Sequence, residues 1–161
     1  MTQTPPQHPP GKPISDEDRE RLGGFVLDLG LRRLPAPEDE LIFELDNMPY
    51  RSNSSGLLHG GMIATLIDCT AGLLAWEGVD EQSMTTTTNL SINYLAPVRN
   101  GPARATARML RRGRKSIVVH VDVHDADTGE LAAVATASFM VVVRRDAPQL
   151  AEQTAAESIT G

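Results

Sequence analysis

One carboxylate stands alone in the most apolar part of this sequence. Between Arg51 and Glu77, Asp68 is the only charged residue, and the segment 62–76 carries apolar side chains on nearly every face of a helix. This pattern predicts a helix that is buried on almost all sides. A carboxylate in the middle of such a helix must be paired, hydrogen-bonded or used in chemistry, which makes Asp68 the first candidate catalytic residue.

A second candidate group is the backbone at the start of the same helix. The run His59-Gly60-Gly61 comes directly before the apolar segment. The first N–H groups of a helix have no partner within the helix, and glycine lets another group approach them closely. Together they can hold a carbonyl oxygen that is becoming an oxyanion. The same two glycines also fit a plain tight loop before a helix.

Hydrophobic periodicity predicts the elements that would position these groups. We expect a short helix over 15–22 and, on either side of a Pro-containing turn at 35–37, strands over 25–31 and 40–45. After the central helix we expect strands over 84–94, 103–111, 117–124 and 131–143. In the first of these four, one face should carry Thr85, Thr87, Asn89, Ser91 and Asn93. A buried helix followed by strands with short connections predicts an α+β fold, with an antiparallel sheet wrapped around one long central helix.

Length and composition indicate one domain. The chain has 161 residues, 40% of them hydrophobic, and we place the folded domain at 15–145 between a disordered N-terminal tail (1–14) and a flexible C-terminal tail (146–161). A net charge of −6 argues against nucleic acid as a partner. The N-terminus is polar and Pro-rich, no apolar run is long enough to span a membrane, and the chain has one cysteine. These features predict a cytoplasmic protein with no membrane partner.

Several motifs, in this order and at these spacings, resemble a known family. Asn53, Gly56, His59-Gly60-Gly61 and Asp68 match the pattern N-x-x-G-x-x-H-G-G with a carboxylate eight residues after the first glycine of the pair. The similarity continues through 85–97 and 113–116. The sequence therefore resembles the hotdog-fold acyl-CoA thioesterases of the phenylacetate-pathway type. The resemblance implies a hotdog fold, a homodimer that is commonly paired again into a tetramer, and no metal or redox cofactor.

The resemblance also implies roles for individual residues. Asp68 would be the nucleophile or, as we favour, the general base that activates a water, and the Gly60 N–H would donate to the oxyanion. Asn53 matches the position that orients the thioester or the water, and Thr87 matches the hydroxyl that holds the water or the carboxylate. Each has a structural alternative, because Asn53 is a good turn former and Thr87 lies in a Thr-rich strand where a neighbouring threonine could take its role.

Other candidate residues are assigned supporting roles. The resemblance implies that His59 and Gly61 shape the helix entrance and contact the bound substrate. Cys69 follows Asp68 and points about 100° away from it around the helix, so we interpret it as a packing residue. His120 and His124 share one face of a strand but have no third ligand nearby in sequence, so we expect no metal site.

Basic residues gather where acids are absent. Between Gln82 and Val121 there is no Asp or Glu, yet seven Lys and Arg residues fall there. In an acidic protein this excess fits a polyanion such as the phosphates of coenzyme A, or a solvated sheet face. The family resemblance assigns the nucleotide contacts to Arg112, Arg114, Lys115 and Ser116, beside Gly113.

The sequence thus predicts an enzyme that hydrolyses acyl-CoA or aryl-CoA to the free acid and CoA. The alternative is a non-catalytic hotdog module that binds acyl-CoA as a regulator. A binding module would have no need of a lone acid in an apolar helix, so Asp68 discriminates between the two. The acyl group is not specified by any motif.

Overall fold

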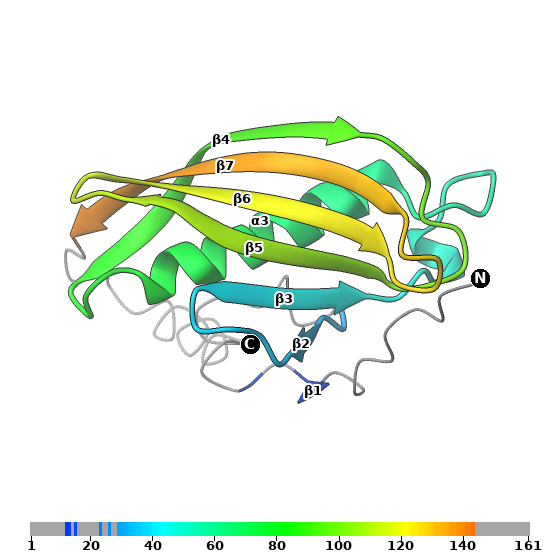
Figure 1. Cartoon of the computed structure of the whole chain (residues 1–161), viewed down its shortest axis with the longest axis horizontal. Coiled ribbons are helices and arrows are strands. Elements are labelled where there is room, and N and C mark those ends of the chain that lie inside the picture. Colours follow the sequence, from blue (N-terminus) through cyan, green and yellow to red (C-terminus); the bar gives the residue numbers. More distant parts are fainter. Residues whose placement is uncertain (1–11, 14, 16–22, 24–25, 27–28, 144–161) are drawn as a thin grey trace, which may run out of the picture.

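The computed structural model describes residues 12–13, 15, 23, 26 and 29–143. In this part of the chain, one seven-stranded antiparallel sheet lies against the long helix α3 (Gly60–Glu77), as Figure 1 shows. The strands are β1 (Lys12–Pro13), β2 (Arg32–Leu34), β3 (Glu40–Leu45), β4 (Ser83–Tyr94), β5 (Ala103–Arg112), β6 (Ser116–Asp125) and β7 (Leu131–Val143), and a short 3-10 helix, η1, spans Pro49–Arg51. Their order across the sheet is β1-β2-β3-β5-β6-β7-β4. The predicted α+β architecture, a sheet wrapped around one central helix, is confirmed.

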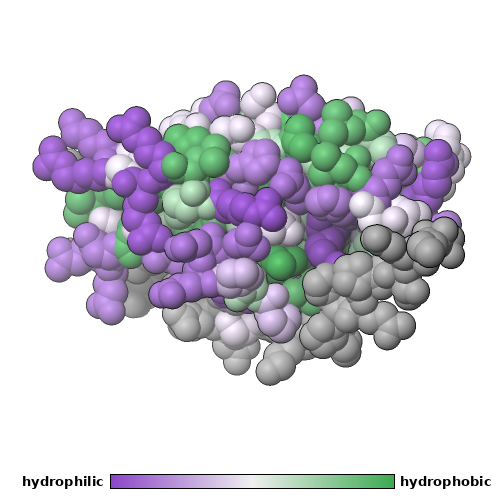
Figure 2. Space-filling view, viewed as in Figure 1, coloured by the Kyte–Doolittle hydropathy of each residue, from purple (hydrophilic) through white to green (hydrophobic). Residues whose placement is uncertain are grey.

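Alternation along the strands buries one face of the sheet against α3. In β6 the alternate residues Ile117, Val119, Val121 and Val123 are fully buried, and in β3 so are Leu41, Phe43 and Leu45. Each such side chain contributes roughly 1.5–3 kcal/mol by leaving water. The opposite face of the sheet, which Figure 2 shows from the side viewed in Figure 1, is mainly hydrophilic over its centre. This packing fixes the angular position of α3 and therefore which of its residues remain accessible.

The expectation that α3 is buried on almost all sides is wrong for one stripe. Thr65, Asp68, Gly72 and Trp76 are only partly buried in the single chain. Their spacing of three and four residues places them on one face of the helix. The sequence does not reveal this stripe, because Ala64, Gly72 and Trp76 are themselves apolar and resemble the residues of the core.

A β-bulge in β4 changes the predicted distribution of its side chains. The pairing of β4 with β7 shifts between Thr87 and Asn89, so Thr88 is an extra residue, and its hydroxyl donates to the Ser138 carbonyl oxygen at 3.0 Å. Thr85 and Thr87 pair with residues of β7 on the helix side, whereas Asn89, Ser91 and Asn93 pair with residues on the outer side. The prediction that these five residues share one face is therefore wrong, because a bulge reverses the alternation beyond it.

The N-terminal elements differ most from the prediction. Val26 is helical and Leu29 and Gly30 form a turn, so the expected strand over 25–31 is wrong at the described residues, and strand β2 begins only at Arg32. Gly30 has a φ of 61°, which ends any regular extended run there. The predicted helix over 15–22 and the tails at 1–14 and 146–161 lie outside the described residues, apart from Ser15 and the two residues of β1.

The remaining strands agree with the prediction to within one residue at each end. The short connections expected between these strands are present around Gly113, between β5 and β6, and at 126–130, between β6 and β7. Within the described residues, no helix has the length and apolar content needed to cross a membrane.

Candidate active site

Asp68 and Thr87 come together between helix and sheet. Asp68 lies in the middle of α3, and the Thr87 hydroxyl, from the residue just before the bulge in β4, donates to Asp68 Oδ1 at 2.9 Å. Among the described residues, no Lys, Arg or His side chain pairs with this carboxylate. Its negative charge is therefore held by a neutral hydroxyl only. Such a carboxylate can accept a proton from a bound water or attack a carbonyl carbon.

The accessible stripe of α3 faces a cavity of about 570 Å³. The helix contributes Thr65, Asp68, Gly72 and Trp76 to its walls, and the sheet contributes Thr85, Thr87, Leu90 and Phe139. A concave, largely apolar space with a few convergent polar groups is the usual form of a small-molecule site. Asp68 and Thr87 supply the acid and the hydroxyl in this one.

The entrance of α3 is arranged by His59, which is the N-cap residue. The His59 Nδ1 atom accepts a hydrogen bond from the Gly61 N–H at 3.0 Å. The Gly60 carbonyl oxygen accepts from the Tyr94 hydroxyl at 2.9 Å, while in the part of the chain that is described no acceptor is found for the Gly60 N–H. This leaves Gly60 with a free donor at the positive end of a helix of 18 residues.

Asn53 is engaged in the loop before the helix. Its side-chain oxygen accepts from the backbone N–H groups of Ser55 at 2.9 Å and Leu57 at 3.2 Å. The loop turns at Gly56, which has a φ of 76°. Asn53 is not among the residues that line the Asp68 cavity. In the single chain it has the turn-forming role, and its catalytic role stays a prediction.

Gly60 and Asp68 do not meet within one chain. They are eight residues apart on one continuous helix, so about 12 Å separates them along its axis. Gly60 does not line the Asp68 cavity. A thioester carbon and its oxygen are one bond apart, so an acid and an oxyanion donor at this separation cannot act on the same group.

Cys69 lines the same cavity but is poorly suited to nucleophilic attack. Cys69 is only 7% exposed. This burial, together with the charge of the adjacent Asp68, raises the pKa of the Cys69 thiol to about 12. The thiol is therefore protonated at neutral pH. This agrees with the interpretation of Cys69 as a packing residue.

The predicted basic turn forms the β5–β6 hairpin. The Gly113 N–H donates to the Ser116 carbonyl oxygen at 3.0 Å, and a Cβ on Gly113 would lie 2.8 Å from that oxygen, so the tight turn needs glycine. Arg112, Arg114 and Lys115 line a second cavity of about 630 Å³, which is completed by Gly78, Val79, Asp80, Ser83, Val141 and Val143. The three predicted cations therefore line one cavity, and their contact with a nucleotide stays a prediction.

The sequence reasoning missed several residues of the site. Tyr94 contacts the Gly60 carbonyl, and Gly72, Trp76 and Phe139 line the cavity. A usable signal was present for two of them, because Asp68, Gly72 and Trp76 follow one another at intervals of four residues, the spacing of one helix face. For Tyr94 and Phe139 the signal depends on strand register, which the bulge at Thr88 obscures.

Comparison with known proteins agrees with this fold. A model of the thioesterase superfamily matches residues 55–132. The medium/long-chain acyl-CoA thioesterase YigI of Salmonella typhimurium is 32% identical over 129 residues, which cover 72% of this chain and 83% of YigI.

Solved structures give the same result. The protein BH2602 of Bacillus halodurans, solved with CoA, has a TM-score of 0.61 and 32% identity, covering 63% of this chain and 66% of that one. A phenylacetic acid degradation-related protein of Ralstonia eutropha has a TM-score of 0.65 and 27% identity, covering 70% of this chain and 86% of that one.

Proposed function

Because this chain belongs to the thioesterase superfamily, with the hotdog fold and the thioester hydrolase activity of that family, we propose that it hydrolyses acyl-CoA or aryl-CoA thioesters with Asp68 as the general base. The observation that carries the assignment is the hydrogen bond between Thr87 and Asp68 at the wall of the Asp68 cavity. The hydroxyl holds the carboxylate toward the cavity without neutralising it as a cation would.

The reaction follows from these groups. Asp68 takes a proton from a water as the water oxygen bonds to the thioester carbon, and the carbonyl electrons move onto the carbonyl oxygen. A backbone N–H stabilises this oxyanion. The intermediate then collapses, the C–S bond breaks, and the CoA thiolate takes the proton from Asp68. Acid and CoA leave with all atoms accounted for, and no metal or redox cofactor is required.

The oxyanion donor comes from a second subunit in this proposal. Gly60 lies about 12 Å from Asp68 along its own helix, so it cannot reach the same carbonyl. Two antiparallel copies of α3 in a homodimer would bring Gly60 of each subunit to Asp68 of the other. His59 and Gly61 then shape the entrance to the partner's cavity, and Asn53 supports the loop that presents them. Two such dimers could pair further into a tetramer.

Mixed dimers test the shared site. Asp68→Ala removes the base, and Gly60→Pro removes the N–H while remaining compatible with a helix start. Each variant alone should be nearly inactive. A mixed dimer contains one doubly defective site and one intact site, so activity should return to about half per dimer. If both groups came from one chain, every site would keep one defect and mixing would restore nothing.

Release of free thiol from phenylacetyl-, benzoyl- and octanoyl-CoA tests the activity itself. Turnover of at least one of them is expected, with kcat/KM identifying the acyl group. A non-catalytic acyl-CoA-binding module would bind these thioesters and release no thiol. The uncompensated carboxylate of Asp68 favours the enzyme.

A further inference from the structure

Strand β4 runs back along α3, so residues of the two elements face one another in a fixed order. Near the start of the helix, the Tyr94 hydroxyl donates to the Gly60 carbonyl oxygen at 2.9 Å. Near its middle, the Thr87 hydroxyl donates to Asp68 Oδ1 at 2.9 Å. Thr85 lies two residues before Thr87 on the same face of β4, and therefore closer to the helix C-terminus. Asp68 and Thr87 thus lie part-way along their cavity, which extends from them toward both ends of the helix.

The two ends of the Asp68 cavity differ in polarity and in space. Toward the helix C-terminus its walls are mainly apolar and include Gly72, Leu73, Trp76, Thr85 and Phe139. Toward the helix N-terminus they include Ala64, Thr65 and Leu90, and in the proposed dimer this half of α3 faces the antiparallel helix of the second subunit. Each methylene of an acyl chain gains free energy by leaving water for an apolar surface. The acyl group is therefore better accommodated on the C-terminal side of Asp68.

Gly72 keeps this side of the cavity open. Phe139, which pairs with Thr87 across the sheet, is only 2% exposed, and its ring lies against Gly72, where a Cβ would be 3.6 Å from Phe139 Cε1. A larger side chain at this position would project between Asp68 and Trp76. The glycine thus leaves a path along the helix surface from the carboxylate to the indole.

Trp76 ends this path. Among the residues of α3 that line the cavity it is the nearest to the helix C-terminus, and the second cavity, which holds Arg112, Arg114 and Lys115, shares no lining residue with it. Trp76 follows Asp68 by eight residues, about 12 Å along the helix axis. Van der Waals contact with the indole takes about 4 Å of this length. The remaining length holds about seven carbon–carbon bonds of an extended chain, at roughly 1.2 Å each.

We propose that Trp76 limits the length of the acyl group, which binds along α3 from Asp68 toward the helix C-terminus. This inference rests on the proposed function. A thioester carbonyl at Asp68 leaves room for an acyl chain of about eight carbons before the chain meets the indole. Longer chains would have to displace the indole from its packing, which makes long-chain thioesters poorer substrates. The substrate class is therefore medium-chain acyl-CoA, and Trp76 acts on specificity without touching the reacting atoms.

The fluorescence of Trp76 tests the position of the chain end directly, because Trp76 is the sole tryptophan of this sequence. The ligands are S-alkyl-CoA thioethers, which cannot be hydrolysed. Ethyl- and butyl-CoA should leave the emission maximum in place, whereas octyl- and decyl-CoA should move it to shorter wavelength, because the chain excludes water from a partly buried indole. An equal shift with every chain length, or no shift with octyl-CoA, would overturn the proposal.

The dependence of kcat/KM on chain length tests the same limit in the reaction. In wild type, kcat/KM should rise by up to about fourfold for each methylene from butanoyl-CoA to octanoyl-CoA, the gain from burying one methylene. It should then fall from dodecanoyl-CoA to hexadecanoyl-CoA, measured below the concentrations at which these thioesters form micelles. A kcat/KM for hexadecanoyl-CoA that equals or exceeds the value for octanoyl-CoA would overturn the proposal.

Two substitutions should move the optimum in opposite directions, which a general loss of packing cannot do. Trp76→Ala should lengthen the preferred chain by at least about two carbons, since the indole occupies the length of several bonds of roughly 1.2 Å. Gly72→Ala places a methyl group in the path, and the ratio of kcat/KM for octanoyl-CoA to that for butanoyl-CoA should fall by about tenfold. Alanine favours a helix interior over glycine, so a weaker fold does not explain this loss. A Trp76→Ala profile identical to that of wild type would overturn the proposal.

The control is Leu110→Ala, which removes a large apolar side chain that is 61% exposed on β5 and lies outside the Asp68 cavity. Its chain-length profile should match that of wild type, and a profile that moves as in Trp76→Ala would overturn the proposal. Failure of the proposed function looks different, because wild type then releases no thiol from any acyl-CoA, or Asp68→Asn keeps its activity. In that case the fluorescence measurement still decides whether the chain ends at Trp76.

Discussion

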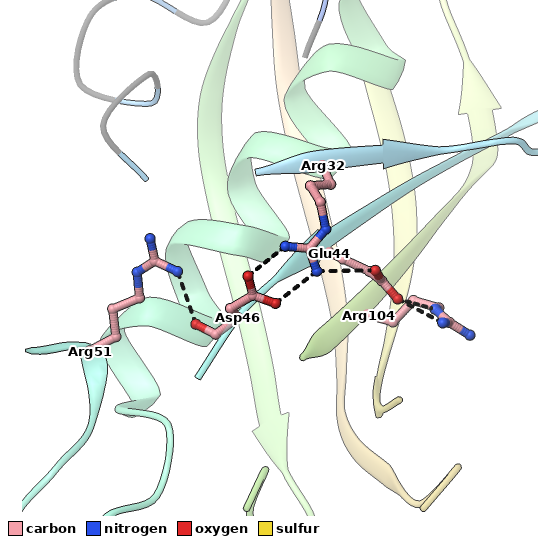
Figure 3. A network of polar contacts seen from close by, with 5 residues as sticks. All are labelled: Arg32, Glu44, Asp46, Arg51 and Arg104. Carbon is pink, nitrogen blue, oxygen red and sulfur yellow. Dashed lines mark hydrogen bonds and ion pairs between the residues drawn. The ribbon is translucent and has the colours of Figure 1, made fainter. Parts of the chain in front are cut away.

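The carboxylates on the two faces of the sheet have different partners. On the outer face, Glu44 lies between two arginines, with Arg104 at 2.6 Å and Arg32 at 3.4 Å, and Asp46 accepts two hydrogen bonds from Arg32 at 2.5 and 2.7 Å (Figure 3). On the inner face, Asp68 has only the neutral hydroxyl of Thr87 at 2.9 Å among the described residues. The charge of a carboxylate is thus balanced by arginines on the outer face and by no cation on the inner face.

Two carboxylates on the outer face, those of Asp46 and Asp122, are held in their charged form, because their pKa values are lowered. Burial raises the pKa of Asp122, but hydrogen bonds from His120 and Arg108 lower it by more, so the net pKa lies below the usual value. An acid that is held ionised in this way is a poor proton acceptor in a reaction, while it serves to join strands β5 and β6. A carboxylate without a cationic partner is therefore the better candidate for proton transfer. Substitution of carboxylates of both kinds tests this.

The largest expected effect is that of Asp68→Asn. The amide keeps the shape and can still accept from Thr87, but it cannot take a proton, so kcat should fall by at least about 100-fold. The matched control is Asp122→Asn on the outer face, for which kcat should stay within about twofold of wild type. Thiol release under saturating acyl-CoA measures both. Near wild-type turnover by the Asp68 variant, or an equal loss in the control, would remove the distinction between the two faces.

Thr87→Val should have the next largest effect. Valine keeps the shape of the side chain and loses the hydroxyl, so Asp68 is no longer held and kcat should fall by about tenfold, whereas Thr87→Ser should retain most of the activity. Thr86→Val is the control, because Thr86 pairs with Met140 on the outer side of the strand. Larger losses from Thr86→Val than from Thr87→Val would mean that the functional register of β4 is shifted by one residue.

The register of β4 shows how far the sequence could predict the site. Thr87 was identified by its place in a motif, but the face that it shares with its neighbours was not, since strict alternation assigns Asn89 and Ser91 to the helix side. The extra residue Thr88 has no distinctive side chain that marks a bulge in a run of four threonines. Local pattern therefore predicted the strand, and only its pairing with β7 located the change of face.

Other elements of the fold were predictable where a local sequence pattern specifies them. The central helix follows from one long apolar run, and the strands after it follow from period-two alternation. The segment 25–31 is also apolar and alternating, yet Gly30 with its positive φ and the helical Val26 exclude a strand there. The separation of Gly60 and Asp68 follows from helix geometry alone, whereas the residues that line the Asp68 cavity depend on which strands pack against α3.

A smaller effect is expected at Cys69. With a pKa of about 12, roughly one thiol in ten thousand is ionised at pH 8. Cys69 should therefore react with iodoacetamide far more slowly in the folded protein than in urea, and Cys69→Ala should keep kcat within about twofold of wild type. Mass spectrometry of the alkylated chain measures the first and thiol release the second. Rapid labelling of the folded protein together with loss of activity would place the nucleophile at Cys69 and return Asp68 to a supporting role.

The smallest effect is expected on the outer face, at Asp46. Its hydrogen bonds with Arg32 lower the pKa of its carboxyl, so the folded state favours the ionised form more than the unfolded state does. Asp46→Asn should reduce the free energy of unfolding at pH 7 by about 1 kcal/mol or less, because the Asp46 side chain is 44% exposed and solvent screens the pair.

The sign of the pH dependence distinguishes this ion pair from a packing effect. The contribution of a carboxyl with a lowered folded pKa is present above its unfolded pKa, near 4, and is lost as the pH falls through the folded value. The difference in the free energy of unfolding between wild type and Asp46→Asn should therefore shrink as the pH is lowered from 7 toward 2. Urea unfolding at fixed protein concentration measures it. The substitution leaves in place the hydrogen bond that the Arg51 guanidinium donates to the backbone carbonyl of Asp46, so the difference reports on the carboxylate. A difference that is constant with pH would show that Asp46 acts through packing, and the contrast with Asp68 would then rest on Glu44 and Asp122 alone.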